Sequence, residues 1–186
     1  MSILKLLAGC GVNAEVVFGS PVVFRANGIS FISTTFDTAN SKVVIAYQDS
    51  NNGEKGTVVV GTVSGKSITF GTPVVFLNSS TRDIATTYDS TNNKVIIAYR
   101  GPSNYGYAVV GTVSGTSISF GSPTTFESGL TTNISTTYDS NSNKVVVAFK
   151  DETNSNYGTV KVGSVSGTSI VFNWGPAAGI VFEAAD

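Results

Sequence analysis

The stretch "VVGTVSGTSISFG" at Val109–Gly121 decides the fold, because the chain contains it three times. Nearly the same letters stand at 59–71 and, in a looser form, at 161–173. Each copy has a run of β-branched residues, a short turn and a second run that alternates polar and apolar residues. This pattern predicts a β-hairpin with Ser-Gly at the two central turn positions, where the backbone needs a residue that tolerates positive φ.

The repeat extends beyond the hairpin. The sequence "FISTTFDTANSKVVIAYQD" at 31–49 returns, with small changes, at 83–101 and at 133–151. Each run is rich in β-branched and aromatic residues and is bounded by Gly, Asn, Asp or Ser, so we expect four strands in each unit. In the middle unit the expected strands begin at Ile84, Lys94, Tyr107 and Ser117.

The four strands of a unit differ in the surroundings that they suit. The first carries the small residues Ala85, Thr86 and Thr87, and the second and third are apolar on both faces. The fourth contains Pro123, which cannot donate to a ladder and belongs on an edge strand. This order, from small residues through fully apolar strands to an amphipathic strand with proline, is typical of a β-propeller blade. The strand with small residues would lie near the axis and the proline-bearing strand at the outer edge.

We therefore predict an all-β, β-propeller-like fold of three four-stranded antiparallel repeats, preceded by an N-terminal arm at 1–13. The single β-repeat domain spans 14–186. It begins with an extra strand at 15–24 that repeats the fourth strand of a unit. The repeats are expected at about 31–76, 83–126 and 133–182.

Three blades are too few for a ring, because propellers usually close with about 4 to 8. We therefore expect a homo-oligomer, a dimer or trimer, and a dimer with six blades is the simplest. The extra strand would complete or cross the subunit boundary. The alternative architecture is a trimeric β-prism or fibre, in which the same hairpins stack along an axis.

Composition excludes several classes of function. The chain has no histidine, one cysteine, 12% charged residues and a net charge of −1. We expect no enzyme, no cofactor, no metal site and no nucleic-acid partner, because the usual general base, the commonest metal ligand and a basic stripe are absent. No segment approaches the roughly 20 apolar residues of a membrane span. The stretch Leu7-Ala8-Gly9-Cys10 looks like a lipoprotein cleavage box, but Lys5 interrupts its apolar run and favours an ordinary arm.

Three aspartates, Asp37, Asp89 and Asp139, end the first strand of each unit and precede polar turns. The letters "DSNSN" from Asp139 begin like a calcium loop. Lys144 and Lys150 then stand where that loop needs glycine and glutamate. We expect all three aspartates to close Asx turns.

Two sets of residues are candidates for ligand binding. Arg25, Arg82 and Arg100 belong to loops that open on one face of a propeller, where arginines can grip a carboxylate with paired hydrogen bonds. The loops between second and third strands supply flat apolar rings beside amide groups, a combination that suits a glycan. These residues are Asn104, Tyr105, Asn156 and Tyr157. We expect Trp174 to plug the irregular last strand.

At "ISTTYDSNSNKVVVAFKDETNSNYG" and the following "VGSVSGTSI" the chain resembles the repeat arrays of bacteriophage and environmental viral virion proteins, including tail-fibre-like proteins. It resembles sialidase-type propeller blades more distantly, without their S-x-D-x-G-x-x-W box. The resemblance implies a non-catalytic structural or attachment protein of the virion, located there or outside cells. Its partners would be itself, other virion proteins and a surface glycan. A free lectin and a glycosidase-like module are the alternatives.

Overall fold

The structure, a computed structural model, describes residues 18–172 and the backbone of 180–183. It contains three antiparallel sheets. The first sheet comprises β1 (Ile29–Asp37), β2 (Lys42–Asp49), β3 (Lys55–Ser64), β4 (Ser67–Phe70) and β5 (Val74–Ser80). The second comprises β6 (Arg82–Asp89), β7 (Lys94–Arg100), β8 (Gly106–Ser114), β9 (Ser117–Phe120) and β10 (Thr124–Glu127). The third comprises β11 (Thr131–Asp139), β12 (Lys144–Asp151), β13 (Tyr157–Ser166), β14 (Ser169–Phe172) and β15 (Ile180–Glu183).

Two single-turn 3₁₀ helices, η1 (Ser50–Asn52) and η2 (Pro102–Asn104), connect second to third strands. No helix in the described part of the chain is long and apolar enough to cross a membrane. The all-β class and the threefold repeat predicted from the sequence are thus confirmed. The expected arm at 1–13 and Trp174 lie outside the described residues.

The fourth strand of each unit is broken in two, which corrects the expectation of one continuous strand. In the second sheet, β9 and β10 both pair with β8, and residues 121–123 separate them. Pro123 cannot donate to the ladder there. A Cβ at Gly121 would meet the backbone carbonyl oxygen of Thr168, in the turn between β13 and β14 of the third sheet. The break is therefore the point where the rim of one sheet contacts the hairpin of the next.

The hairpin turn lies one residue later than the sequence suggested. Ser114 and Ser117 form the last pair of the β8–β9 ladder, so Gly115 and Thr116 are the central residues. Gly115 has φ 61°, and Thr116 is not among the residues with positive φ. A glycine at the first central position suits a type II′ turn. The prediction of Ser-Gly at the centre was wrong, because it gave the positive φ to the second central residue.

The first strand of each repeat, β1, β6 or β11, carries a β-bulge at the same place. The bulge residues are Phe31, Asp83 and Asn133, with φ of 50°, 48° and 54°. Positive φ is uncommon for residues other than glycine, and a β-bulge redirects nearby side chains. In the second sheet the bulge presents Asp83 to Arg100, with its Oδ2 2.8 Å from Nε.

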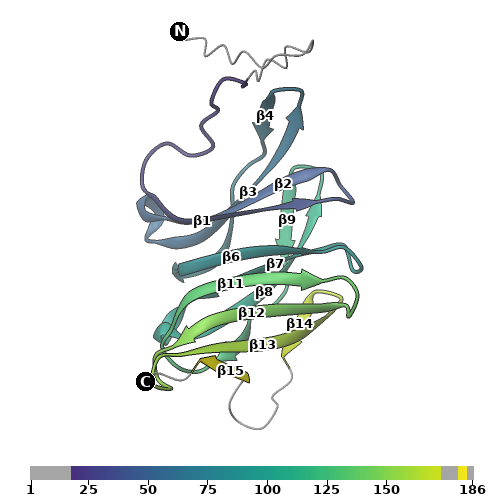
Figure 1. Ribbon diagram of the computed structural model, residues 1–186. Helices are drawn as coiled ribbons and strands as arrows, with labels where there is room; N and C mark the ends of the chain where they lie inside the picture. The colour runs from purple at the N-terminus through teal and green to yellow at the C-terminus, as the bar shows by residue number, and fades with distance from the viewer. Residues whose placement is uncertain (1–17, 173–179, 184–186) are drawn as a thin grey trace, which may run out of the picture.

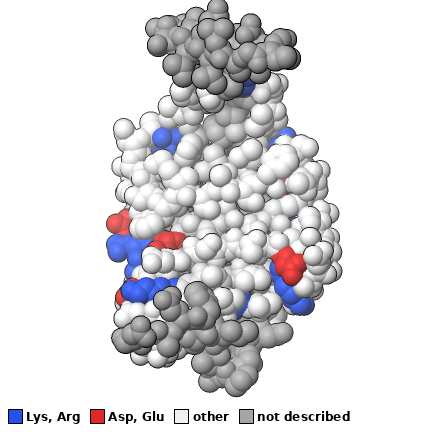
Figure 2. Space-filling model, viewed as in Figure 1, with Lys and Arg blue, Asp and Glu red and all other residues white. Residues whose placement is uncertain are grey.

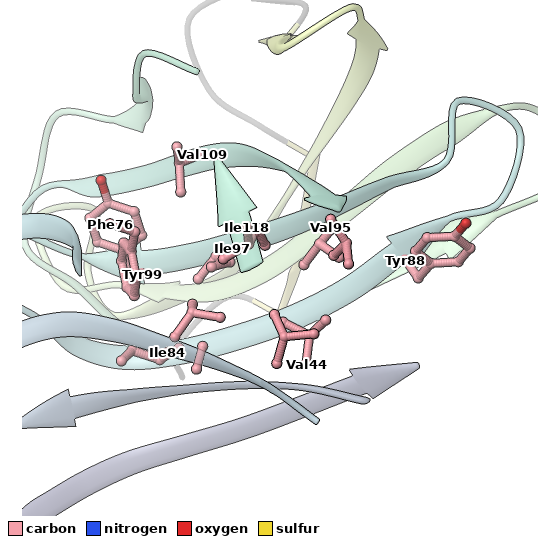
Figure 3. Close-up of a cluster of buried hydrophobic side chains, with 13 residues drawn as sticks. Val44, Phe76, Ile84, Tyr88, Val95, Ile97, Tyr99, Val109 and Ile118 are labelled. Carbon is pink, nitrogen blue, oxygen red and sulfur yellow. The ribbon is translucent and has the colours of Figure 1, made fainter. Parts of the chain in front are cut away.

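The three sheets form an open stack (Figure 1), in which β6 lies between β1 and β11. A buried apolar cluster joins the first and second sheets, and another joins the second and third. Figure 3 shows the first of these, where Val44 of β2 faces side chains of the second sheet. Both faces of β7 are covered, so that Val95, Ile96 and Ile97 are fully buried. The described residues do not close a ring.

Each sheet is also linked to the next by a phenylalanine. Phe76 of β5 lies over Gly56 of its own sheet, where a Cβ would collide with the ring. Its ring contacts Tyr99 and Phe120 of the second sheet, at centroid distances of 5.2 and 6.0 Å. Phe126 makes the corresponding contacts with the third sheet. Glycine thus makes room for the residue that joins two repeats.

The extra strand expected at 15–24 does not form in its described part, residues 18–24, and residues 15–17 lie outside the described range. Among the described residues, no sheet precedes the first one to offer this segment a ladder. Phe24 nevertheless contacts Tyr47 and Phe70, at 5.4 and 6.0 Å, as Phe76 contacts the second sheet. Phe24 therefore takes the same position against the first sheet that Phe76 of β5 takes against the second, although residues 18–24 form no strand.

Candidate functional site

The three aspartates at the ends of the first strands are structural, as predicted. Oδ1 of Asp89 accepts hydrogen bonds from the backbone N–H groups of Thr91 and Asn92, both at 2.9 Å. Asp37 accepts from the backbone N–H of Asn40, at 3.0 Å. Asp139 likewise accepts from the N–H groups of the following turn. These carboxylates close Asx turns.

Two of the three candidate arginines lie together. Arg82 and Arg100 are directly opposite each other on β6 and β7, at the end of the second sheet. They line a cavity of about 260 Å³ with Ser79, Ser80, Ser103 and Asn104. Like charges directly opposite on neighbouring strands repel each other, so this pair is destabilising unless anions lie close by.

The carboxylates of Asp83 and Glu54 are the anions that lie close to the two arginines. Nε of Arg100 lies 2.8 Å from Oδ2 of Asp83, and its Nη1 donates to Oδ1 of Asn104 at 3.4 Å. Nη2 of Arg82 lies 3.6 Å from Oε2 of Glu54, a contact between two half-exposed side chains. Arg100 is therefore fixed by its neighbours, whereas Arg82 is held loosely at the cavity rim.

Glu54 is a polar neighbour of the cavity that the sequence did not single out. The hydroxyl of Ser80 donates to its Oε2 at 2.6 Å. This hydrogen bond, with a smaller contribution from Arg82, lowers the pKa of Glu54 below its ordinary value. The carboxylate therefore remains charged at neutral pH and competes with any anionic ligand for Arg82.

The loop beside the cavity has an unusual backbone. Ser103 and Asn104 have φ of 60° and 62°, in the left-handed region. A Cβ at Gly101 would approach the rings of Tyr107 and Tyr99 to about 3 Å, so the chain passes close to the sheet at this point. Ser155 and Asn156 have nearly the same φ values, 55° and 63°, in the corresponding loop of the third repeat, so this backbone is a feature of the loop type.

The remaining candidates do not line the cavity. Arg25 pairs with Asp49, its Nη2 3.1 Å from Oδ1, next to the first sheet. Tyr105 follows the loop, and its carbonyl accepts from the N–H of Gly101 at 3.0 Å. Asn156 is exposed with φ 63°, and Tyr157 begins β13 in the third sheet. The expected glycan residues therefore belong to two separate loops.

Sequence reasoning found the two arginines and Asn104 but missed Ser79, Ser80, Ser103 and Glu54. A signal for the serines existed, because "NSS" precedes Arg82 directly in the sequence. Glu54 lies in the turn before β3 of the first sheet, whereas Arg82 is on β6 of the second, and no sequence pattern indicated that contact.

Charged side chains are sparse on the face shown in Figure 2 and gather along its edges. Within residues 18–172, no three His, Cys, Asp or Glu side chains are grouped so that they could hold a metal ion. The arrangement around Arg82 and Arg100 can bind, through charge and hydrogen bonds, a small anion that bears hydroxyl groups. A comparison with protein-family models finds no match to this chain, and a comparison with curated proteins finds no significant match either.

Proposed function

We propose that this protein is a non-catalytic attachment module that binds an acidic sugar in the cavity between Arg82 and Arg100. The observation that carries the proposal is the placement of these two side chains directly opposite each other in one cavity. A guanidinium presents a planar fork of N–H donors that matches a carboxylate. A bound carboxylate would replace Glu54 as the partner of Arg82, because the present contact between those two side chains is long and half-exposed.

The other lining groups suit the rest of a sugar. Ser79, Ser80 and Ser103 carry hydroxyls, and Asn104 carries an amide. These groups both donate and accept hydrogen bonds, as sugar hydroxyls require. The volume of about 260 Å³ lies just below the usual range of small-molecule pockets, about 300–1,000 Å³. A single acidic sugar unit is therefore the ligand class that fits.

Binding without turnover is supported by the carboxylates near the cavity. Hydrolysis of a glycoside needs two carboxyl groups, one of which has a raised pKa and acts as the acid. Glu54 has a lowered pKa, and Asp83 is paired with Arg100. The chain also has no histidine that could take over as general acid or base.

We further propose that the sheets are propeller-like blades and that the module serves a virion structural or attachment protein. The blade arrangement is supported by the close approach of β1, β6 and β11 and by the placement of the broken strands at the rim. The virion role is supported by the resemblance of the repeats. Variable loops on a rigid β scaffold are a common place for binding.

Titration with glucuronate, followed by chemical-shift changes in NMR spectra, tests the binding role. We expect shifts of the Gly101 and Asn104 amides with glucuronate and none with glucose. The Arg82→Ala variant should weaken binding at least about 10-fold, as expected for a lost charge-assisted bond. Arg100→Lys keeps the charge but loses the fork, and should also weaken binding.

Arg25→Ala is the matched control, because Arg25 is also ion-paired but does not line the cavity. It should bind glucuronate like the unchanged protein. Equal binding by Arg82→Ala and the unchanged protein, or equal shifts with glucose and glucuronate, would contradict the proposal.

A further inference from the structure

Within residues 18–172, the exposed large apolar side chains belong to the first and third sheets and to the segment before β1. The middle sheet, β6–β10, has no exposed large hydrophobic residue, whereas the described part of the chain elsewhere has ten. On the segment before β1 these are Phe18, Val22 and Val23; on the first sheet they are Phe31, Ile32, Phe36, Val63 and Val75; and on the third sheet they are Val162 and Val171. Patches of this kind mark interaction sites.

The exposed residues of the first sheet match residues that are buried one repeat later. Ile32, Phe36 and Val63 are 53%, 50% and 54% exposed. Their counterparts in the second sheet are Ile84, Tyr88 and Val113, at 7%, 9% and 7%, all within the cluster that the first sheet covers. The front of the first sheet, which we call the head face (Ile32, Thr34, Phe36 and Val63), is thus a surface of a type that is covered elsewhere in the molecule.

The third sheet also has an uncovered face, on the side away from the second sheet. Val162 is 37% exposed, and its counterpart Val110 is fully buried against the third sheet. Ser135, Val146 and Ala148 line a shallow hollow of about 80 Å³ beside it. Together with Val162 these residues form what we call the tail face. Its counterpart on the first sheet includes Val44 and Ala46, which share a buried cluster with Ile84.

We propose that two copies of this chain associate head to tail, each head face packing on the tail face of the other, to close a ring of six sheets. The molecule already packs such faces together twice, between its first and second and between its second and third sheets. The assembly repeats this contact at both ends. Six is the only multiple of three within the usual 4 to 8 blades of a propeller.

A hydroxyl pair supports this choice of partner. Ser33 lies on the face of the first sheet that packs against the second sheet. Its hydroxyl hydrogen-bonds to that of Thr86, with 2.9 Å between the oxygens. Ala85 takes the place of Ser33 at the next boundary, so that pair is absent there. At the proposed boundary the corresponding residues are Ser135 of one copy and Thr34 of the other, and both hydroxyls are present again.

The segment before β1 takes part in the same contact. Val22 and Val23 correspond to Val74 and Val75, which pair with β3 at the rim of the first sheet. In the ring they adjoin residues 158–160 of β13 in the second copy, the edge to which β15 pairs within one chain. The two segments compete for one edge, so we infer that β15 gives way and that residues 22–24 complete the rim.

Sedimentation velocity of the full chain tests the proposal. We expect one species of about 39 kDa, twice the chain mass of 19.3 kDa. Ile32→Glu and Val162→Glu each place a charge in both copies of the contact, and each should raise the dissociation constant roughly 100-fold or more. Ser119→Glu adds the same charge to the exposed rim of the middle sheet and should leave the dimer intact. Far-ultraviolet circular dichroism verifies that all variants are folded.

Mixing the two variants distinguishes head-to-tail packing from a face-to-face dimer. A mixed pair has one intact contact, formed by the head face of Val162→Glu and the tail face of Ile32→Glu. The mixture should therefore dimerise more strongly than either variant alone. In a face-to-face dimer through the first sheet, Val162→Glu would stay dimeric by itself, and this result would overturn the proposal.

A disulfide provides a second readout. A Thr34→Cys, Ser135→Cys variant, with Cys10→Ser to remove the native thiol, should form a covalent dimer on oxidation. Thr34→Cys with Cys10→Ser alone should not. A monomeric unchanged protein at 100 μM, or growth into ever larger assemblies with concentration, would overturn the two-copy ring.

Discussion

Phe76 packs edge-on against Tyr99 across the boundary between the first two sheets, with ring centroids 5.2 Å apart and the ring planes inclined at 61°. Phe126 and Phe149 make the corresponding contact one repeat later, also at 5.2 Å. These pairs come from different repeats, so each joins two units that are similar in sequence. The stability of the stack therefore depends on packing at these boundaries as well as on the hydrogen bonds within each sheet.

The first prediction concerns Phe126, which is fully buried. Phe126→Ala should lower the free energy of unfolding by about 3–5 kcal/mol, because it removes a large side chain and leaves a cavity. Chemical denaturation measures the change. Val171→Ala is the control: Val171 of β14 is 61% exposed and lies on neither the head face nor the tail face, so the change should stay within about 0.5 kcal/mol. Equal effects of the two substitutions would contradict the boundary role.

The second prediction concerns the hydroxyl of Tyr99, which is buried and has no hydrogen-bond partner within the described residues. Burial raises the pKa of Tyr99. Phe149 occupies the same place in the third repeat, so the site tolerates a ring without the hydroxyl. Tyr99→Phe should therefore stabilise the protein by about 1 kcal/mol, the lower end of the cost of an unsatisfied buried group.

Tyr88→Phe is the matched control for this substitution. The hydroxyl of Tyr88 donates to Asn93 at 3.1 Å and accepts from the backbone N–H of Ala39 at 3.3 Å. Its removal should destabilise the protein by about 1 kcal/mol. Urea unfolding of both variants gives the signs, and a loss of stability in Tyr99→Phe would show that its hydroxyl has a partner.

The third prediction concerns Gly71, which lies in the break between β4 and β5. A Cβ there would meet the backbone carbonyl oxygen of Thr116, in the hairpin turn of the second sheet. Because a backbone atom cannot move aside as a flexible side chain can, Gly71→Ala should lower the free energy of unfolding by about 1–3 kcal/mol. Thr72→Ala, at the exposed neighbouring residue, should have little effect. A thermal melt compares them.

The fourth prediction is a loss of stability in acid. The pKa of Asp139 is lowered, chiefly by the hydrogen bond from the side chain of Ser142, and that of Glu152 by the hydrogen bond from Thr132. A lowered pKa in the folded state stabilises that state above the ordinary values of 3.8 and 4.5. This contribution is lost as the pH falls through the lower, folded pKa values.

The melting temperature should therefore change little between pH 7 and pH 5, as far as these two groups are concerned, and should fall below about pH 4. Asp139→Asn should reduce the slope in acid, because one of the titrating groups is removed. An unchanged slope in this variant would show that Asp139 does not contribute.

The repeat predicted the number of sheets and the order of strands within them, because alternation and turn residues are local signals. The Asx turns were predictable for the same reason: Asp89 bonds only to the residues that follow it. The position of the turn at Gly115 was missed by one residue, since Ser-Gly and Gly-Thr both suit a two-residue hairpin.

The candidate site was predicted less well, because it depends on contacts between distant parts of the chain. Arg82 and Arg100 were named, but their cross-strand register follows from the bulge at Asp83, which no local pattern indicated. Arg25 was grouped with them because the loops of a propeller would bring it to the same face, although its partner is Asp49. The division of the fourth strand into β9 and β10 was missed, because polar and apolar residues alternate in "SISFGSPTTF" on both sides of its proline.

The break in the rim strand has a consequence for solubility. A long exposed edge strand offers unpaired backbone groups on which other chains can add, and this is a route to amyloid. Here the edge of the second sheet is divided into two four-residue pieces, β9 and β10, with Pro123 between them. Such short pieces are poor templates for sideways fibril growth, so this edge of the second sheet is protected although the chain is rich in valine and threonine.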